Sequence, residues 1–203
     1  ERILRQMKQI NKSFDKNLNE TIKVKKSLKG NLKEIDKAIK RITETFINGG
    51  KVIFCGNGGS AADAQHLTAE LLVRLNPKVN RKSLPAISLA QDVSTITACS
   101  NDYSFEEIFS RNLNSLGNKI DLLVAISTSG KSKNVINVLK MAKKKKIYSI
   151  SFLGNNGGKC SEITDLPIIV KSKNTARIQE AHIFLGHYIL DMVEKELRYK
   201  SFI

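Results

Sequence analysis

Short apolar runs alternate with longer amphipathic segments through most of this chain, and this alternation limits the possible folds more than any other feature. The apolar runs are KVIFC (51–55), DLLVAIS (121–127), IYSISFL (147–153) and LPIIV (166–170). Strands that are separated by helices form parallel β-α-β units. Strands this apolar are covered on both faces. The pattern therefore predicts an α/β fold, a three-layer sandwich around a central parallel sheet.

The first 48 residues carry no strand signal and are predicted to form two helices, over 1–28 and 31–48, broken near Lys29–Gly30. The second helix has an apolar stripe at helical spacing that requires a packing partner: Leu32, Ile35, Ile39, Ile42 and Phe46. The glycines at 49 and 50 favour a helix end there. We therefore expect an N-terminal helical arm over 1–48 and one α/β domain over 49–203, closed by a long helix over about 175–200.

Composition limits where such a chain acts. No apolar run reaches the roughly 18 residues that span a bilayer, and no signal peptide is visible. Three cysteines without CxxC spacing fit a reducing compartment, so we expect a cytoplasmic protein. The formal net charge is +15, but most of the basic residues are lysines scattered through predicted helices. This favours a solvated surface over a nucleic-acid site, so nucleic acid and membrane are not expected partners.

The first apolar run ends in a glycine-rich turn, GNGGSA (56–61), which nominally matches the dinucleotide fingerprint GxGxxA. That fingerprint also needs an acidic residue about 20 positions further on, which binds the ribose. The sequence has NPKVNRKSLP (76–85) there, without a carboxylate, so we expect no nucleotide cofactor. The turn either holds an anion or a sugar hydroxyl at a helix N-terminus, or serves only as a tight turn.

A second loop, ISTSGKS (126–132), follows another predicted strand. It places four hydroxyls around Gly130, those of Ser127, Thr128, Ser129 and Ser132. Hydroxyls and free backbone amides at the start of a helix form a phosphate cradle. Serine and threonine also cap helices for purely structural reasons, but one cap needs only one hydroxyl. Four hydroxyls therefore favour a phosphorylated ligand.

Two predicted helices carry side chains that suit acid–base or metal chemistry. His66 and Glu70 are spaced i and i+4, as an acid–base couple, two metal ligands or an ordinary surface pair. The last helix places Gln179, His182 and His187 in a largely apolar segment, where a lone histidine is more often a satisfied core residue than a ligand. At about 1.5 Å per residue, Gln179 and His187 lie roughly 12 Å apart along the helix axis. They share one ion only by leaning together or by coming from different subunits.

Five stretches together carry a resemblance: CGNGGSAADAQHLTAEL (55–71), SLPAISL (83–89), CSND (99–102), AISTSGKS (125–132) and ARIQEAHIFLGHYI (176–189). In this order they resemble the sugar isomerase (SIS) domain family, with its Rossmann-like sheet. More narrowly, they resemble the bacterial phosphoheptose isomerases. The second loop marks the whole SIS superfamily, whereas AQHLTAEL combined with RIQEAH and GH is much narrower.

The resemblance implies an isomerase that converts D-sedoheptulose 7-phosphate to D-glycero-D-manno-heptose 7-phosphate through an enediol. This is the first step of heptose synthesis for lipopolysaccharide or capsule. It also implies one zinc ion per subunit, held by His66, Glu70, Gln179 and His187, with Glu70 and His187 as the acid–base pair. The implied substrate contacts are Asn57, Gly58, Gly59, Glu70, Asn101, Asp102, Ser127, Thr128, Ser129, Ser132 and Gln179. The family forms homotetramers with active sites at subunit contacts.

Two other functions remain open at this point. One is a non-enzymatic SIS protein that binds the bacterial replication initiator, and the other is a different phosphosugar isomerase or a sugar-phosphate sensor. The sensor would keep STSGKS (127–132) without needing the metal set. The complete set of four implied zinc ligands favours the isomerase, because a binding module has no need of it.

Overall fold

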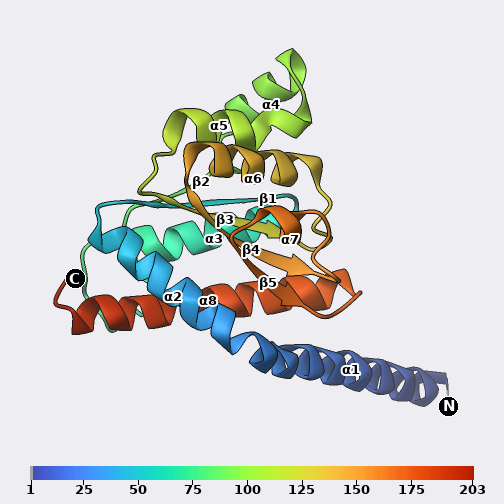
Figure 1. The fold of residues 1–203 in the computed structure, drawn as a ribbon. Helices are drawn as coiled ribbons and strands as arrows, with labels where there is room; N and C mark the ends of the chain where they lie inside the picture. The colour runs from blue at the N-terminus through green and yellow to red at the C-terminus, as the bar shows by residue number, and fades with distance from the viewer. Residues whose placement is uncertain (1) are drawn as a thin grey trace.

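Five parallel strands form the central sheet of the structure, a computed structural model that describes residues 2–203 (Figure 1). The strands are β1 (Val52–Gly56), β2 (Ala86–Ser88), β3 (Leu122–Ser127), β4 (Tyr148–Gly154) and β5 (Leu166–Val170). They lie in the order β2-β1-β3-β4-β5. The four predicted strands are confirmed, and β2 was missed. It has only three residues, too few for an alternating pattern, and it pairs with β1 at the edge of the sheet.

Helices cover both faces of the sheet, which confirms the predicted three layers (Figure 1). The longer ones that follow the arm are α3 (Gly59–Leu72), α4 (Val93–Asp102), α5 (Ile108–Leu116), α6 (Lys133–Lys145) and α8 (Thr175–Tyr199). Short turns of helix lie at η1 (Leu28–Asn31), η2 (Phe105–Glu107) and α7 (Cys160–Ile163). No helix among residues 2–203 is both long and apolar enough to cross a membrane.

The strands divide their side chains between two cores. Phe54 and Val124 point to one face of the sheet and pack with residues of α3 and α8. Their neighbours Ile53 and Leu123 point to the other face and pack with residues of α5 and α6. Successive side chains of a strand alternate between faces, so strands that are apolar throughout bury both faces. The sheet is therefore fully enclosed, and polar chemistry is confined to its edges and to the helices.

The two N-terminal helices have different environments. Helix α2 (Leu32–Ile47) buries Ile35 and Phe46 in the same core as α8, although Leu32, at the start of the predicted stripe, is exposed. Helix α1 (Arg2–Ser27) projects from the body of the molecule (Figure 1), and Val24 is its only buried residue. Since α2 shares the core, the arm that stands free is α1. The division of the chain at residue 48 stays a prediction.

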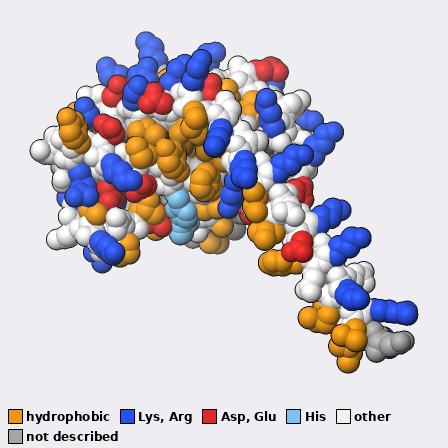
Figure 2. Space-filling model, turned by 90° about the horizontal axis from the view of Figure 1, so that it is seen from below, with side chains coloured by type: hydrophobic (Ala, Val, Ile, Leu, Met, Phe, Trp, Pro, Cys, Tyr) orange, Lys and Arg blue, Asp and Glu red, His pale blue; other side chains and the backbone are white. Residues whose placement is uncertain are grey.

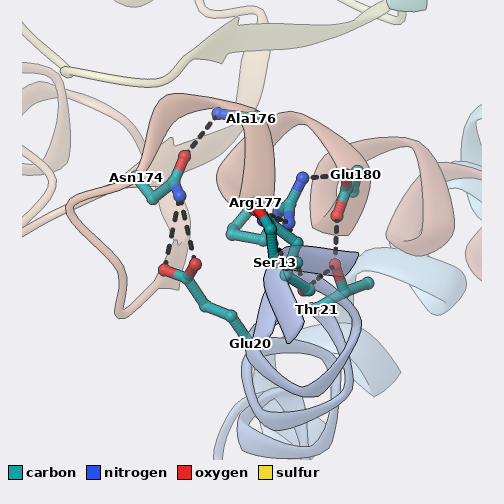
Figure 3. Close-up of polar contacts among 8 residues, drawn as sticks. Ser13, Glu20, Thr21, Asn174, Ala176, Arg177 and Glu180 are labelled. Carbon is teal, nitrogen blue, oxygen red and sulfur yellow. Dashed lines mark hydrogen bonds and ion pairs between the residues drawn. The ribbon is translucent and has the colours of Figure 1, made fainter. Parts of the chain in front are cut away.

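Polar contacts fix the last turns of α1 against the first turns of α8 (Figure 3). The Thr21 hydroxyl donates to Glu180 Oε2 at 2.9 Å, and Arg177 Nη2 lies 2.7 Å from Glu180 Oε1. The Asn174 amide, at the N-terminus of α8, donates to both carboxylate oxygens of Glu20 at 3.3 Å. These contacts hold α1 beside the turn of α8 that carries the RIQEAH segment.

Candidate active site

The reversal of strand order between β1 and β3 places two loops together at the carboxyl edge of the sheet. The chain moves from β1 outward to β2, and later returns to pair β3 with the other side of β1. Open α/β sheets bind ligands at such a switch point. Here the loop after β1 carries Asn57, and the loop after β3 leads into Asn134. The two side-chain amides exchange a pair of hydrogen bonds, each of 2.8 Å. This bridge joins the two loops.

The first loop is only partly available for a ligand. The backbone N–H groups of Ser60 and Ala61 donate to the carbonyls of Asn57 and Gly58, both at 3.0 Å, and the Ser60 side chain is buried. At this helix start, the hydrogen bonds of the turn therefore occupy most of the groups that were expected to bind an anion. Gly58 sits in the left-handed region, with φ of 57°, which favours glycine there.

The second loop keeps part of its hydroxyl set free. Ser127 Oγ accepts from the Gly130 N–H at 3.1 Å, and Ser129 Oγ accepts from the Lys131 N–H at 3.2 Å. Ser132 occupies the N-cap position of α6, but its side chain makes no capping hydrogen bond. A hydroxyl at a helix N-terminus without an internal partner is ready to donate to an anion.

The histidines and glutamate of the two predicted helices converge on one point. His66 Nε2 lies 3.1 Å from Glu70 Oε1 and 2.8 Å from His187 Nε2, and His187 Nε2 lies 3.8 Å from the same glutamate oxygen. The side chains of His66 and His187 are 50% and 40% exposed, and that of Glu70 is 17% exposed. Three interpretations were open for His66 and Glu70: an acid–base couple, two metal ligands or an ordinary surface pair. The nearby His187 imidazole is least consistent with the surface pair.

Close packing of α3 against α8 produces this convergence. A Cβ atom on Gly186 would lie 2.6 Å from the terminal carbons of Leu67, so glycine at this position lets the Leu67 side chain pack directly against the backbone of α8. Leu67 and Gly186 directly adjoin His66 and His187 in the sequence, so the contact sets the separation of the two imidazoles. Two turns earlier, the Gln179 amide lies against Gly59, at the start of α3. The matching order of these contacts shows that the two helices run parallel.

Burial and neighbouring charge favour a neutral His187. Partial burial and the nearby His66 lower the pKa of His187, while Glu70 opposes this shift. With two ring nitrogens 2.8 Å apart, only one of them carries the proton that lies between them. A neutral His187 keeps one ring nitrogen with a lone pair that can take a proton or bind a metal ion.

Asp63 is a titratable group that sequence reasoning missed. It lies on α3 one turn before His66, and one of its carboxylate oxygens is buried without a hydrogen-bond partner. Burial raises the pKa of Asp63 to about 6, and the proximity of His66 partly offsets this shift. No apolar period or motif singles out this residue, because its neighbours on α3 are small.

The three clustered side chains fit a divalent metal of the zinc class. At metal–ligand bonds of about 2.0–2.1 Å, tetrahedral ligand atoms lie roughly 3.3 Å apart. The observed separations of 2.8, 3.1 and 3.8 Å bracket this value. Two imidazoles and one carboxylate are also the donor set of many catalytic zinc sites, which keep one position open. The cluster His66–Glu70–His187 can therefore hold a metal ion.

Other predicted site residues lie apart from this cluster. Asn101 and Asp102 are exposed on α4, where the Asn101 amide donates to Asp102 at 2.9 Å. Helix α4 packs on α5, on the opposite face of the sheet from α3 and α8. The Gln179 side-chain amide lies against Gly59 at the start of α3. Of the four implied zinc ligands, the structure brings His66, Glu70 and His187 together within one chain.

His182 corrects a sequence-based expectation. It is fully buried, as expected for a core residue on α8, but neither ring nitrogen has a partner with good hydrogen-bond geometry. Burial lowers the pKa of His182 to about 4, although the backbone of Leu153 lies close enough to oppose the shift. His182 is therefore a neutral core residue, but not a satisfied one.

Two cavities flank the candidate site. One, of about 440 Å³, opens beside His187 and is lined by Phe184, Tyr188 and the loop that follows α3. The same face of the molecule shows the histidines, an apolar area next to them and an apolar stripe along α1 (Figure 2). The other cavity, of about 630 Å³, adjoins Ser129 on the far side of the second loop.

Comparison with known proteins places this geometry in a family. The SIS domain model matches residues 15–154. The chain is 45% identical to a phosphoheptose isomerase of Helicobacter pylori, over 88% of this chain and 92% of that relative. It is 49% identical to one of Chlorobaculum parvum, over 78% and 76% of the two chains. The structure of the phosphoheptose isomerase of Neisseria gonorrhoeae superposes with a TM-score of 0.86 at 36% identity, over 92% of this chain and 99% of that one. The chain therefore belongs to the SIS domain family and, within it, to the phosphoheptose isomerases.

Proposed function

We propose that the chain converts D-sedoheptulose 7-phosphate to D-glycero-D-manno-heptose 7-phosphate, a precursor of the heptoses in lipopolysaccharide or capsule. The convergence of His66, Glu70 and His187 from two helices is the observation that carries this proposal. A non-enzymatic binding protein has no need of such a cluster. The relatives found by comparison are named as isomerases, so the alternative of a replication-initiator partner is not favoured.

The reaction moves one proton between two neighbouring carbons of the open-chain sugar. A base removes a proton from C1 of the ketose, the C2 carbonyl becomes an enediol, and a proton returns to C2 to give the aldose. A carboxylate and a neutral imidazole suit these transfers, since both can be tuned toward neutral pH. We assign the transfers to Glu70 and His187, because the lowered pKa of His187 leaves it unprotonated and ready to accept a proton.

Zinc is the proposed metal, with one ion per subunit held by His66, Glu70 and His187. When bound there, it would supply Lewis-acid polarisation of the substrate carbonyl. Gln179 is proposed as a further ligand or substrate contact, since its amide lies against Gly59 at the start of the helix that carries His66 and Glu70. No nucleotide cofactor is required by this chemistry.

The second loop is proposed to hold the phosphate far from the reacting carbons. The hydroxyls of Thr128, Ser129 and Ser132, together with the first backbone amides of α6, are the groups proposed to contact the phosphate. Such an anchor supplies binding energy that orients the sugar without taking part in the proton transfer. Asn57 is proposed to contact the sugar at the junction of the two loops, where Asn134 holds its amide. Gly58 and Gly59 let the sugar approach the backbone there.

A homotetramer is proposed to complete the site. The two imidazoles are half exposed in one chain, and Asn101 and Asp102 lie on a helix that does not reach the cluster. Helix α1 also carries an exposed apolar stripe, with side chains 41% to 76% exposed: Ile3, Met7, Ile10, Phe14, Leu18 and Ile22. A stripe of this length on a projecting helix is typical of a helix–helix interface. We place the assembly in the cytoplasm, on the basis of its phosphorylated substrate and reduced cysteines.

Proton NMR of the purified protein with sedoheptulose 7-phosphate in D₂O tests the reaction. We expect an aldose-phosphate anomeric signal that disappears when a chelator removes the metal and returns when zinc is added. Turnover that survives complete chelation would contradict the assigned metal but retain the isomerase. Absence of turnover with zinc present would overturn the proposed function.

Light scattering tests the assembly. Glutamates at two positions of the α1 stripe, Ile10→Glu and Phe14→Glu, should lower the measured mass, because they would place charges in an apolar interface. The matched control is Lys12→Glu and Lys16→Glu, which changes charge by the same sign on the polar face of the same helix. An unchanged mass for the stripe variant would show that α1 is not an assembly element.

A further inference from the structure

The cavity of about 630 Å³ beside the second loop has the size of a ligand site. It lies at the carboxyl ends of β3, β4 and β5, away from the junction of β1 and β3 where the sugar is proposed to bind. None of the side chains proposed for proton transfer or metal binding lines it. Ser129 is the one proposed substrate contact that it shares.

Its lining selects for a negatively charged ligand. Three lysines, Lys131, Lys171 and Lys173, face this cavity, and we call it the basic pocket. Within residues 2–203, none of their ammonium groups forms an ion pair with a carboxylate. The rest of the lining consists of hydroxyls and side-chain amides, with neither a carboxylate nor an aromatic ring. Such a surface recognises phosphate groups and sugar hydroxyls, and it offers no platform for stacking a nucleobase.

The walls of the basic pocket are already joined to one another. The Asn155 N–H donates to the Ser172 carbonyl at 3.1 Å, which links the loops after β4 and β5. The Cys160 N–H donates to the Gly130 carbonyl at 3.0 Å, which links the loops after β3 and β4. A Cβ on Gly130 would lie 1.9 Å from the Gly157 carbonyl oxygen, so these loops are in direct contact. A pocket fixed in this way loses little flexibility on binding.

We propose that the basic pocket binds a second anionic ligand, a phosphorylated sugar with more than one anionic group, distinct from the substrate phosphate in the second loop. Ser129 lies on the boundary between the two sites. Two phosphates on either side of one residue repel each other, and the interior of a pocket screens them less than water does. Occupancy of the basic pocket therefore weakens binding of the substrate. This regulatory consequence rests on the proposed function, whereas the binding itself does not.

Calorimetric titration of the full chain with fructose 1,6-bisphosphate, used as a probe, tests the binding. The double variant Lys171→Ala and Lys173→Ala should bind the probe at least about tenfold more weakly, because two charge-assisted contacts are lost. The matched control, Lys143→Ala and Lys144→Ala, removes the same charge from the end of α6. It should bind within about twofold of the unchanged chain, as expected when the effect is local. Equal weakening by both double variants, or by neither, would overturn the proposed pocket.

Steady-state kinetics separates the second site from the substrate site. The probe should raise the KM for sedoheptulose 7-phosphate in the unchanged chain and leave it unaltered in the Lys171/Lys173 variant. Without the probe, the variant should keep its kcat, and its KM should rise by no more than about twofold, because the two lysines lie outside the substrate phosphate site and act on it only at a distance. If its KM instead rises by the same factor as its affinity for the probe falls, both measurements report one phosphate site, and the second ligand is refuted. Failure of turnover in every chain would refute the proposed function, while the calorimetric result would still decide the binding.

Discussion

The two ends of the proposed substrate site are built from different kinds of structure. The reacting end stands on α3 and α8, where the contact between Leu67 and Gly186 sets the distance between the two imidazoles. The phosphate end stands on a loop, whose serines are held by single turn hydrogen bonds of 3.1 and 3.2 Å. Proton transfer and metal binding need side chains placed to within tenths of an ångström, and packed helices provide this. Several hydroxyls around a phosphate tolerate more movement. Damage to the helix end should therefore lower kcat, and damage to the loop end should raise KM.

The largest expected effect is that of Glu70→Gln. It keeps the shape of the side chain but removes the proton acceptor and one anionic ligand, so turnover should fall by at least about a hundredfold. Thermal unfolding should change little, because glutamine fills almost the same volume as glutamate at this partly buried position. The control Glu162→Gln, at an exposed position of α7, should retain full activity. Near-normal turnover of Glu70→Gln would show that Glu70 is not the base.

Gly186→Ala tests the reacting end of the site by changing only the packing between α3 and α8. The added methyl group would lie 2.6 Å from the terminal carbons of Leu67, so this buried side chain must shift or the helices must move apart. We expect a loss of roughly 1–3 kcal/mol in the free energy of unfolding, and turnover reduced by more than about tenfold. Shortening the opposing side chain, in the double variant Gly186→Ala and Leu67→Val, should restore part of both. The control Gly30→Ala, with open space around its Cβ, should change neither the free energy of unfolding nor the turnover. Additive effects of the two substitutions in a double-mutant cycle would refute coupling through this contact.

Ser132→Ala tests the loop end and should act on KM. The hydroxyl makes no capping bond, so its removal costs the fold little. Loss of one hydrogen bond to a charged phosphate should raise KM about tenfold at nearly constant kcat. The control is Ser83→Ala, which removes a surface hydroxyl away from the loop. A fall in kcat with unchanged KM would place Ser132 at the reacting end and remove the contrast between the two ends.

The smallest expected effect on turnover at neutral pH is that of His182→Phe, which tests the core beneath the site. The pKa of His182 is about 4 in the folded chain and 6.5 in the unfolded chain, so the unfolded state binds more protons between these values. Stability from this residue is therefore present above pH 6.5 and lost as the pH falls toward 4, by about 3 kcal/mol in total. Chemical denaturation from pH 7 to 4 should show a flatter stability profile for His182→Phe. Parallel profiles for both chains would contradict the assigned shift.

Sequence reasoning predicted the sheet well, because its longer strands are apolar on both faces and helices separate them. It missed β2, whose three residues are too few to show a period. It placed Leu32 in a buried stripe, but that residue begins the helix and faces solvent. The lesson for the fold is that long elements leave a clear pattern, whereas edges and helix ends depend on tertiary contacts.

The site was predictable only in part. The i, i+4 spacing of His66 and Glu70 put both on one face of α3, and the structure adds His187 to them. The spacing of residues along α8 did not reveal that the Leu67 side chain packs against Gly186. This contact depends on α3, which lies more than 100 residues away in the chain. The Asn57–Asn134 bridge was missed for the same reason, because it joins two loops that are distant in the sequence. The buried carboxylate of Asp63 was missed because no motif or apolar period singles it out.

The apolar stripe of α1 also has a consequence for dilute solutions. A chain that covers this stripe only by association gains stability from its neighbours, so its melting temperature should rise with protein concentration. Newly synthesised chains would lack this stabilisation until they associate. In the proposed assembly, chains that have not yet associated expose the six side chains of this stripe to any other apolar segment. The rate of specific association through α1, relative to the rate of non-specific aggregation, would then set the yield of active protein.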